Sequence, residues 1–367
     1  MARLVARTQK IGKKEDPMRQ ISQEQYVLLE LCELFDEAKK MGINNENDLG
    51  LLLIGGLAVG NIAGPHRYTG DIDVIVRQDR YGAFQALLHK QGYMTKEGRF
   101  KGISASKVYD EHTNPVVVPL TVCVDEVFDM SSKMIYRIQE SFKAPHVGRV
   151  QCHWDESMIV DGIPGLNARE LMILKLMTDE NQREKDLVDI GYLANTRMFK
   201  HLTEEDAKAI AELCYGYSPE LAHHVALKIT KKFLANAGQS FAHIYKQWFA
   251  SAIANFTNVR ELVKDQRKAD ELQAVSAWLP TVKMLDTKIR KYNDMGSLYD
   301  DLEQRNALLA FLGAIQVEIL NICAREANKE SADKLRQQIR KLPETMAGEG
   351  SQDQQGEGPA SSEGSKQ

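Results

Sequence analysis

The sequence has little of what marks membrane, secreted and disulfide-stabilised proteins. Its five cysteines are odd in number and scattered over 367 residues, which is typical of a reduced cytosolic protein. The longest apolar run, residues 51–59 with two glycines inside it, is far too short to cross a bilayer. Residues 1–20 are charged throughout and lack the apolar stretch of a secretory signal. We therefore expect a cytoplasmic protein without a membrane segment.

An excess of charge of one sign is also lacking. The chain has 47 Lys and Arg against 51 Asp and Glu, for a formal net charge of −4. Because there is no global basic field, any contact with nucleic acid has to be a local patch. Hydrophobic residues make up 43% of the chain, ample for a packed core, and the length suits two domains plus tails.

Both ends of the chain are predicted to be unstructured. Residues 1–20 carry six basic and two acidic side chains with few large apolar groups, and residues 347–367 contain no large apolar residue at all. Nothing in such segments offsets the entropy of ordering. We expect four parts: a flexible basic arm (1–20), a first domain (21–197), a helical domain (198–346) and a disordered tail (347–367).

The spacing of apolar residues changes once along the chain. Helical spacing at 21–42 and 81–89 alternates with strand-like runs at 51–54, 71–76 and 116–128, and a weaker run lies at 98–109. After Pro164 every periodic segment indicates a helix. The expected fold class is therefore α+β, a mixed sheet with flanking helices followed by an all-helical domain. The expected later helices are 167–178, 183–195, 203–214, 218–236, 239–262, 266–292, 297–327 and 329–342.

The residues that carry chemistry lie between two of the expected strands. Asp71 and Asp73 open the second strand and project from the same side, roughly 6.5–7 Å apart along the backbone. Two carboxylates so close repel each other, and a divalent cation such as magnesium removes the conflict. Gly55 and Gly56 follow the first strand and open a short helix, where a phosphate can approach backbone amides. This pattern favours phosphoryl or nucleotidyl transfer.

These residues resemble the nucleotidyltransferase superfamily of DNA polymerase beta, whose signature is a glycine pair, a loop and Asp-x-Asp between apolar residues. The sub-pattern Arg67-x-Thr69-x-Asp71-Ile72-Asp73 is most similar to small prokaryotic members, the antibiotic nucleotidyltransferases and the AbiEii-like toxins of type IV toxin–antitoxin systems. The resemblance implies a nucleotidyltransferase-type sheet, two magnesium ions and an NTP such as ATP as co-substrate. It also implies that Arg67 and Thr69 support the bound nucleotide.

The same resemblance implies a third carboxylate on a later strand, as a catalytic residue and metal ligand beside Asp71 and Asp73. Asp125 is the best match. Glu126 and Asp129 remain alternatives, because adjacent strand positions face opposite ways and the register is open.

A second resemblance covers the stretches Leu166–Met177 and Arg183–Ile190, which are similar to a helix pair of toxin-like nucleotidyltransferases. It implies that Lys175 reaches the triphosphate, that Arg183 and Lys185 help to hold the nucleotide, and that Asp186 orients one of these cations. The alternatives are a lysine stem lying along an apolar surface and ordinary ion pairs on an exposed helix.

Other polar residues give weaker signals. His66 lies in the loop before Asp71 and is a candidate neighbour of the nucleotide. A series of basic residues that begins with Lys228, Lys231 and Lys232 is either a solvated helix face or an RNA contact.

The function expected from these features is magnesium-dependent transfer of a nucleoside monophosphate from an NTP to an acceptor hydroxyl. The expected acceptor is RNA, tRNA in particular, in a toxin-like role with an antitoxin protein as partner. Two alternatives remain open: a small hydroxylated acceptor of the aminoglycoside kind, and a non-catalytic nucleotide-binding module.

Overall fold

The computed structural model describes residues 23–64, 67–98, 102–109, 116–152, 158–178, 184–194, 202–234 and 302–341. Contacts divide the chain into two units, Met1–Leu320 and Asn321–Gln367. The expected helices at 239–262 and 266–292, the N-terminal arm and the C-terminal tail lie outside the described residues. The expected division into domains near residue 198 stays a prediction.

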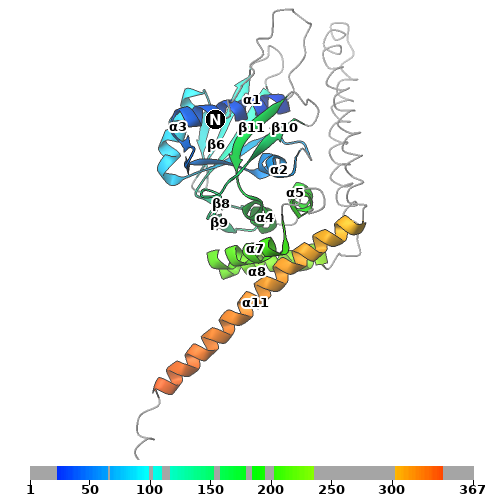
Figure 1. The fold of residues 1–367 in the computed structure, drawn as a ribbon. Helices are drawn as coiled ribbons and strands as arrows, with labels where there is room; N and C mark the ends of the chain where they lie inside the picture. The colour runs from blue at the N-terminus through cyan, green and yellow to red at the C-terminus, as the bar shows by residue number, and fades with distance from the viewer. Residues whose placement is uncertain are drawn as a thin grey trace, which may run out of the picture. The chain divides into compact units, whose positions relative to one another are not determined.

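A mixed sheet forms the centre of the first unit (Figure 1). Neighbouring strands run in the order β10-β11-β3-β4-β7-β6-β5, and the short strands β8 and β9 extend from β7. β3 is parallel to β11 and antiparallel to β4, and β4 is parallel to β7. The bounds of these strands are β3 Leu51–Ile54, β4 Ile72–Val76, β5 Met94–Glu97, β6 Gly102–Tyr109, β7 Val116–Val124, β8 Glu126–Phe128, β9 Ile135–Arg137, β10 His146–Gln151 and β11 Ile159–Gly165.

Buried and more exposed side chains alternate along β7, so the two faces of the sheet differ in burial there. Val118, Leu120, Val122 and Val124 are buried, whereas the residues between them are exposed or half-buried. Helix α1 (Gln23–Lys40) packs on β7 and β11. Helix α2 (Gly55–Ala63) begins directly at the end of β3 and packs against β10, β3 and β4.

Helices occupy the positions that their apolar spacing predicts. α3 spans Tyr81–Lys90, α4 spans Ala168–Met177 and α5 spans Glu184–Ala194. α4 packs against α5 and also against α7 (Glu204–Tyr217) and α8 (Pro219–Lys228) (Figure 1). The expected fold class, a mixed sheet with flanking helices and a helical C-terminal region, is confirmed.

Several details differ from the sequence-based expectation. The single strand expected at 116–128 is two strands, because Asp125 turns the chain with a φ of +56°. The expected helix 218–236 ends in a π-helical segment, Ile229–Leu234, and the two helices expected at 297–327 and 329–342 are one helix, α11 (Leu302–Lys341). Strands β10 and β11 were not expected, nor were β9 and a small hairpin of β1 (Asn44–Asn45) with β2 (Asp48–Leu49).

Helix α11 contains the described segment that is long and apolar enough to cross a membrane. This segment is Arg305–Lys334, and it meets the criterion by length and composition alone. Core helices of soluble proteins meet the same criterion, so the expected absence of a membrane segment stays a prediction.

Candidate active site

Gly55 and Asp73 meet at the corner where β3 ends and α2 begins. β3 pairs with β4 so that Ile54 lies opposite Asp73. Gly55 has a φ of +71°, and a Cβ atom built on it would overlap the carboxylate of Asp73. Only glycine suits this position on both counts. The structure therefore places the predicted phosphate-binding helix start and the predicted metal-binding strand start side by side.

Asp73 is in an environment that opposes its negative charge. Burial raises the pKa of its carboxyl group, and the neighbouring charge of Asp71 raises it further. The positive charges of Lys175 and Lys185 and a hydrogen bond from Thr121 act in the opposite direction. Two close carboxylates, of which Asp73 has a raised pKa, form an arrangement that a divalent cation would stabilise.

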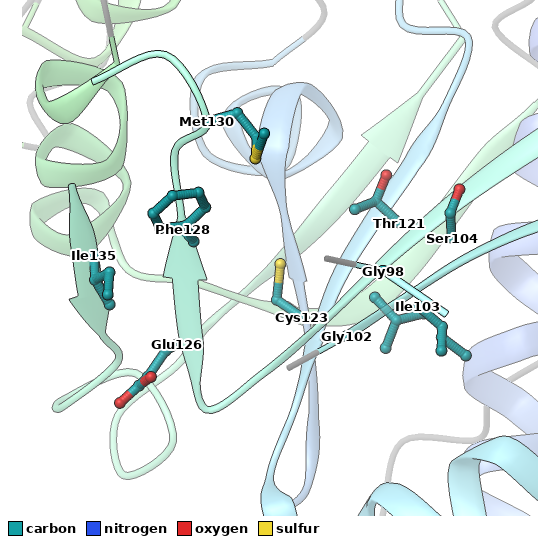
Figure 2. A pocket seen from close by; sticks show the side chains of 11 residues that line it. Gly98, Gly102, Ile103, Ser104, Thr121, Cys123, Glu126, Phe128, Met130 and Ile135 are labelled. Atoms are coloured by element: carbon teal, nitrogen blue, oxygen red, sulfur yellow. The ribbon is translucent and has the colours of Figure 1, made fainter. Parts of the chain in front are cut away.

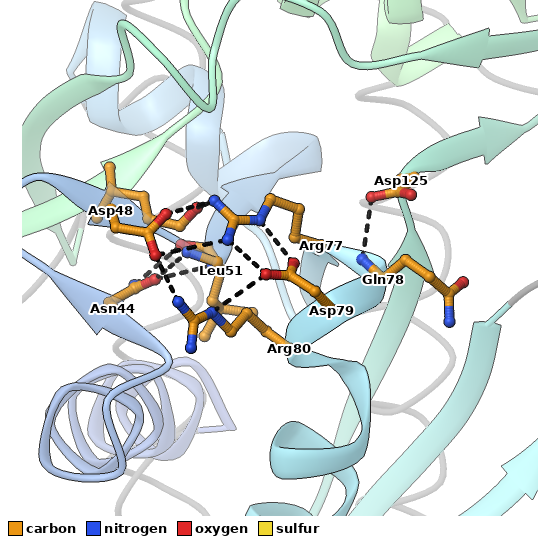
Figure 3. Close-up of polar contacts among 10 residues, drawn as sticks. Asn44, Asp48, Leu51, Arg77, Gln78, Asp79, Arg80 and Asp125 are labelled. Carbon is orange, nitrogen blue, oxygen red and sulfur yellow. Dashed lines mark hydrogen bonds and ion pairs between the residues drawn. The ribbon is translucent and has the colours of Figure 1, made fainter.

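Asp125 lies at the end of β7, beside Gln78, which follows the end of β4 (Figure 3). Asp73 is in register with Thr121, and Asp125 follows four positions later, roughly 13 Å further along the strand. Its carboxylate accepts a hydrogen bond from the backbone N–H of Gln78 at 3.0 Å and lies 3.4 Å from the guanidinium of Arg137. The structure therefore does not bring Asp125 to Asp71 and Asp73. The position beside Asp73 on β7 holds Thr121, a hydroxyl and not a carboxylate.

Neither of the two alternatives, Glu126 and Asp129, supplies the third carboxylate beside Asp71 and Asp73. Glu126 begins β8 and lies opposite Arg137 of β9. Asp129 closes the turn between β8 and β9, where it accepts hydrogen bonds from the hydroxyl of Ser131 at 2.5 Å and the backbone N–H of Ser132 at 2.7 Å. Among the residues that the structure describes, no group of three or more His, Cys, Asp or Glu side chains is arranged to hold a metal ion.

A buried network of ion pairs lies behind the corner. Lys175 of α4 pairs with Asp186 at 2.7 Å and with Asp189 at 2.8 Å, both on α5. Asp189 also accepts two hydrogen bonds from the guanidinium of Arg67, at 2.7 and 2.9 Å. All four side chains are almost completely buried. The structure thus brings Arg67, Lys175 and Asp186 together and pairs both cations with carboxylates, while a contact of Lys175 with the triphosphate stays a prediction.

Gly56 and Thr69 belong to the same network. A Cβ atom on Gly56 would overlap the guanidinium of Arg67 and lie 3.0 Å from the hydroxyl of Thr69. Arg67 donates a hydrogen bond to that hydroxyl at 3.2 Å. The absence of a side chain at Gly56 therefore makes room for Arg67, in addition to any phosphate.

Three residues in or near the site were not predicted. Asp189 stands three positions after Asp186, a spacing that places both on one helix face and that indicates its role. Thr121 gives no signal in the sequence. Lys228, expected on a basic surface, is buried in α8 and donates hydrogen bonds to the carbonyl oxygens of Lys175 (3.1 Å) and Thr178 (2.6 Å) at the end of α4. Arg183 and His66 lie outside the described residues.

The residues present fit one divalent cation better than two. Asp71 and Asp73 supply two carboxylates, and magnesium commonly binds through one or two carboxylates and completes its shell with water and substrate phosphates. Burial and the charge of Asp71 both raise the pKa of the Asp73 carboxyl group, and a bound divalent cation would oppose both effects. A third carboxylate for a second ion is not found among the described residues.

Comparison with known proteins gives distant structural likenesses. No family model and no curated protein matches the sequence. The structure is similar to ANT(2'')-Ia in complex with adenylyl-2''-tobramycin, with 14% identity, coverage of 56% of this chain and 97% of that chain, and a TM-score of 0.28. It is also similar to a Helicobacter pylori protein described as a nucleotidyltransferase, with 11% identity, coverage of 80% of this chain and 97% of that chain, and a TM-score of 0.34. A third similar structure is JHP933 from Helicobacter pylori, with 13% identity, coverage of 86% of this chain and 100% of that chain, and a TM-score of 0.36. At these values the likeness assigns neither a family nor an activity to this chain.

Proposed function

We propose that this protein is a nucleotidyltransferase that moves a nucleoside monophosphate from an NTP to an acceptor hydroxyl, with magnesium as its cofactor. The observation that carries the proposal is the packing of the Asp73 carboxylate against Gly55 at the first residue of α2. Carboxylates for a cation, helix N-terminal amides for a phosphate and fixed positive charges meet at this corner.

Each element of the corner has a distinct role in the proposal. Asp71 and Asp73 would hold the cation, which neutralises phosphate charge when bound. The first amides of α2 bind phosphate oxygens, because Ile54 before them has no side-chain oxygen to cap them. Lys185 is half-buried and near enough to affect Asp73, so it contributes charge stabilisation to the same phosphates.

We extend the proposal to RNA, tRNA in particular, as the acceptor in a toxin-like role that an antitoxin protein counteracts. The support for this extension is the resemblance of the Arg67–Asp73 and Arg183–Ile190 stretches to toxin-like enzymes. Expression in a bacterial host is expected to arrest growth, and the Asp73→Asn variant is expected to relieve the arrest. Harmless expression of the folded wild-type protein would contradict the toxin role.

One transfer assay tests the activity itself. Purified protein is incubated with magnesium, each α-labelled NTP in turn, and either total RNA or a panel of aminoglycosides. We expect label in RNA together with released pyrophosphate. Asp71→Asn and Asp73→Asn are expected to lower the rate by about 100-fold or more. Asp125→Asn is the matched control, because Asp125 lies at the far end of the sheet and asparagine tolerates a positive φ.

The outcomes separate the alternatives. Label in an aminoglycoside and none in RNA would replace the RNA acceptor with a small molecule. Nucleotide binding without pyrophosphate release under any acceptor would indicate a non-catalytic module. Equal loss of activity in the Asp125→Asn variant would show that the assignment of the corner is wrong.

A further inference from the structure

A cavity of about 480 Å³ opens on the sheet beside Asp73. Its floor is formed by β6 and β7, including Ser104 and Thr121, and its wall is the β8–β9 hairpin with Phe128, Met130 and Ile135. Figure 2 shows the hydroxyl groups of Ser104 and Thr121 side by side on neighbouring strands, and Met130 and Cys123 pointing toward one another across the cavity. Its volume is in the range of small-ligand sites.

The cavity shares a face of the sheet with the candidate active site. Thr121 is the register partner of Asp73 on β7, and Ser104 is the register partner of Thr121 on β6. Partners in register point to the same face, so the floor of the cavity continues directly from Asp73. Burial, together with the nearby charge of Asp73, raises the pKa of the Cys123 thiol to about 12.

The lining selects for an uncharged, flat ligand. Phe128, Met130, Ile135 and Ile103 offer apolar and aromatic surface, and Glu126 is the one charged residue among the described lining residues. The lining residues that the structure describes include no lysine or arginine, so they offer no partner for a phosphate. An aminoglycoside carries several positive charges, and Glu126 is the single carboxylate that the described lining offers it. A nucleobase is flat, uncharged and able to stack on an aromatic side chain.

The order of the strands separates the two substrates of the proposed reaction. The phosphate-binding start of α2 lies after β3, on one side of β4, and the cavity lies over β7 and β6, on the other side. An in-line displacement requires the acceptor and the leaving pyrophosphate on opposite sides of the α-phosphorus. The cavity is therefore on the acceptor side of Asp73.

We propose that this cavity binds the terminal nucleobase of an RNA acceptor. This inference rests on the proposed function and specifies its acceptor. A ribose hydroxyl of the terminal nucleotide forms a bond to the α-phosphorus of the NTP, and its proton passes to water. The bond from that phosphorus to the bridging oxygen of the β-phosphate breaks, and pyrophosphate leaves with the bonding electrons.

The test compares two acceptors that differ only in the terminal base. One is a five-nucleotide RNA with a 5′ fluorescent label, and the other is the same RNA with an abasic 3′-terminal residue that keeps its hydroxyls. For the wild-type protein we expect KM and the dissociation constant, measured by anisotropy, to be about tenfold or more higher for the abasic RNA. Equal values for the two RNAs would overturn the inference.

Variants locate the effect in the cavity. Phe128→Ala and Met130→Ala are expected to abolish the discrimination while NTP affinity, measured by calorimetry, stays unchanged. Met130 is 44% exposed, so its variant folds even if the Phe128 variant does not. Met94→Ala on β5 is the matched control, an exposed methionine outside the cavity. A parallel loss of NTP affinity would instead assign the cavity to the base of the NTP and overturn the proposal.

Failure of the proposed function gives a different result. If no label is transferred but the intact RNA still binds about tenfold more tightly than the abasic RNA, the cavity binds a nucleobase and the transferase assignment is wrong. If label is transferred equally to both RNAs, the transferase assignment stands and the cavity inference is wrong.

Discussion

Two glycine positions of α2 differ in how well they would tolerate a side chain. Gly55 has a positive φ and lies against Asp73, whereas a Cβ on Gly60 would have no heavy atom within 4 Å. We expect Gly55→Ala to lower the free energy of unfolding by about 1–3 kcal/mol through backbone strain and overlap. Its transfer activity is expected to fall with the displacement of Asp73. Urea denaturation and the labelled-NTP assay measure the two effects.

Gly60→Ala is the control in the same helix. Alanine is favoured over glycine in a helix by roughly 0.5–1 kcal/mol, so this variant is expected to be as stable as the wild type or slightly more stable. Equal destabilisation by the two substitutions would contradict the close packing of Gly55 on Asp73.

The raised pKa of Asp73 predicts a pH-dependent cost to stability when no divalent cation is present. A carboxyl group whose pKa is higher in the folded state than in the unfolded state, where it is about 3.9, destabilises the fold as pH rises through the folded value. We expect Asp73→Asn to raise the Tm at pH 8, by roughly 2–4 °C for each kcal/mol gained, and the gain to vanish near pH 4.

Magnesium provides the complementary measurement for Asp73. Added magnesium is expected to raise the Tm of the wild type and to leave that of Asp73→Asn unchanged, because a cation bound to the folded state stabilises it. A Tm that responds equally in both proteins would show that Asp73 is not a ligand.

The residues of the corner differ in how far they can be read from the sequence. The placement of Gly55 at the start of α2 and of Asp73 at the start of β4 could be predicted, because strand periodicity and the tolerance of glycine for close approach are local rules, whereas their binding roles stay predictions. Asp125 was misplaced because its position depends on a single-residue turn between β7 and β8 with a positive φ. The sequence does not mark that turn clearly, because a positive φ is uncommon for any residue other than glycine, even though aspartate adopts it more readily than most.

At the scale of secondary-structure elements, one buried aspartate connects α5 both to α4 and to the segment before β4. Asp189 is fully buried and pairs with Arg67 and with Lys175. Its removal leaves two buried cations without this partner, so we expect Asp189→Asn to lower the free energy of unfolding by about 3–5 kcal/mol. Urea denaturation monitored by circular dichroism measures the change.

Asp161→Asn is the control for Asp189→Asn. Asp161 pairs with Arg149 at 2.8 Å, but both side chains are more than half exposed. Surface ion pairs contribute little because solvent screens them, so this variant is expected to unfold at the same urea concentration as the wild type. Similar losses in both variants would mean that the network around Asp189 is not desolvated.

The helices were easier to predict than the strands for a physical reason. In α3, α4 and α5 the apolar residues repeat at helical spacing within a single segment of the chain. Such a helix can be predicted without knowing which other elements it contacts. β10 and β11 contain glycine, and their apolar and polar residues alternate only weakly. The two strands pair with each other, but their place in the sheet depends on the contact of β11 with β3, which is distant in the sequence. Helix α11 was divided in two because its later part is polar, although it continues without interruption.

For the whole molecule, the question raised by α11 is whether the chain enters a membrane. Five apolar side chains repeat at helical spacing and are almost fully buried, and Gln316 donates a hydrogen bond to the carbonyl oxygen of Ala226 in α8 at 3.4 Å. The buried face of this helix packs on the described part of the chain, so we expect this chain in the supernatant after ultracentrifugation without detergent. The five residues are Leu308, Phe311, Leu312, Ile315 and Ile319.

Two leucine variants of α11 test whether this apolar stripe, the five buried side chains just named, contributes to the stability of the fold. Leu312 is fully buried, so Leu312→Ala is expected to lower the free energy of unfolding by about 2–5 kcal/mol. Leu320 is 57% exposed, so Leu320→Ala is expected to have almost no effect on urea unfolding. A protein that pellets with membranes, together with equal and small effects of the two substitutions, would show that the apolar stripe faces lipid and not the rest of the chain.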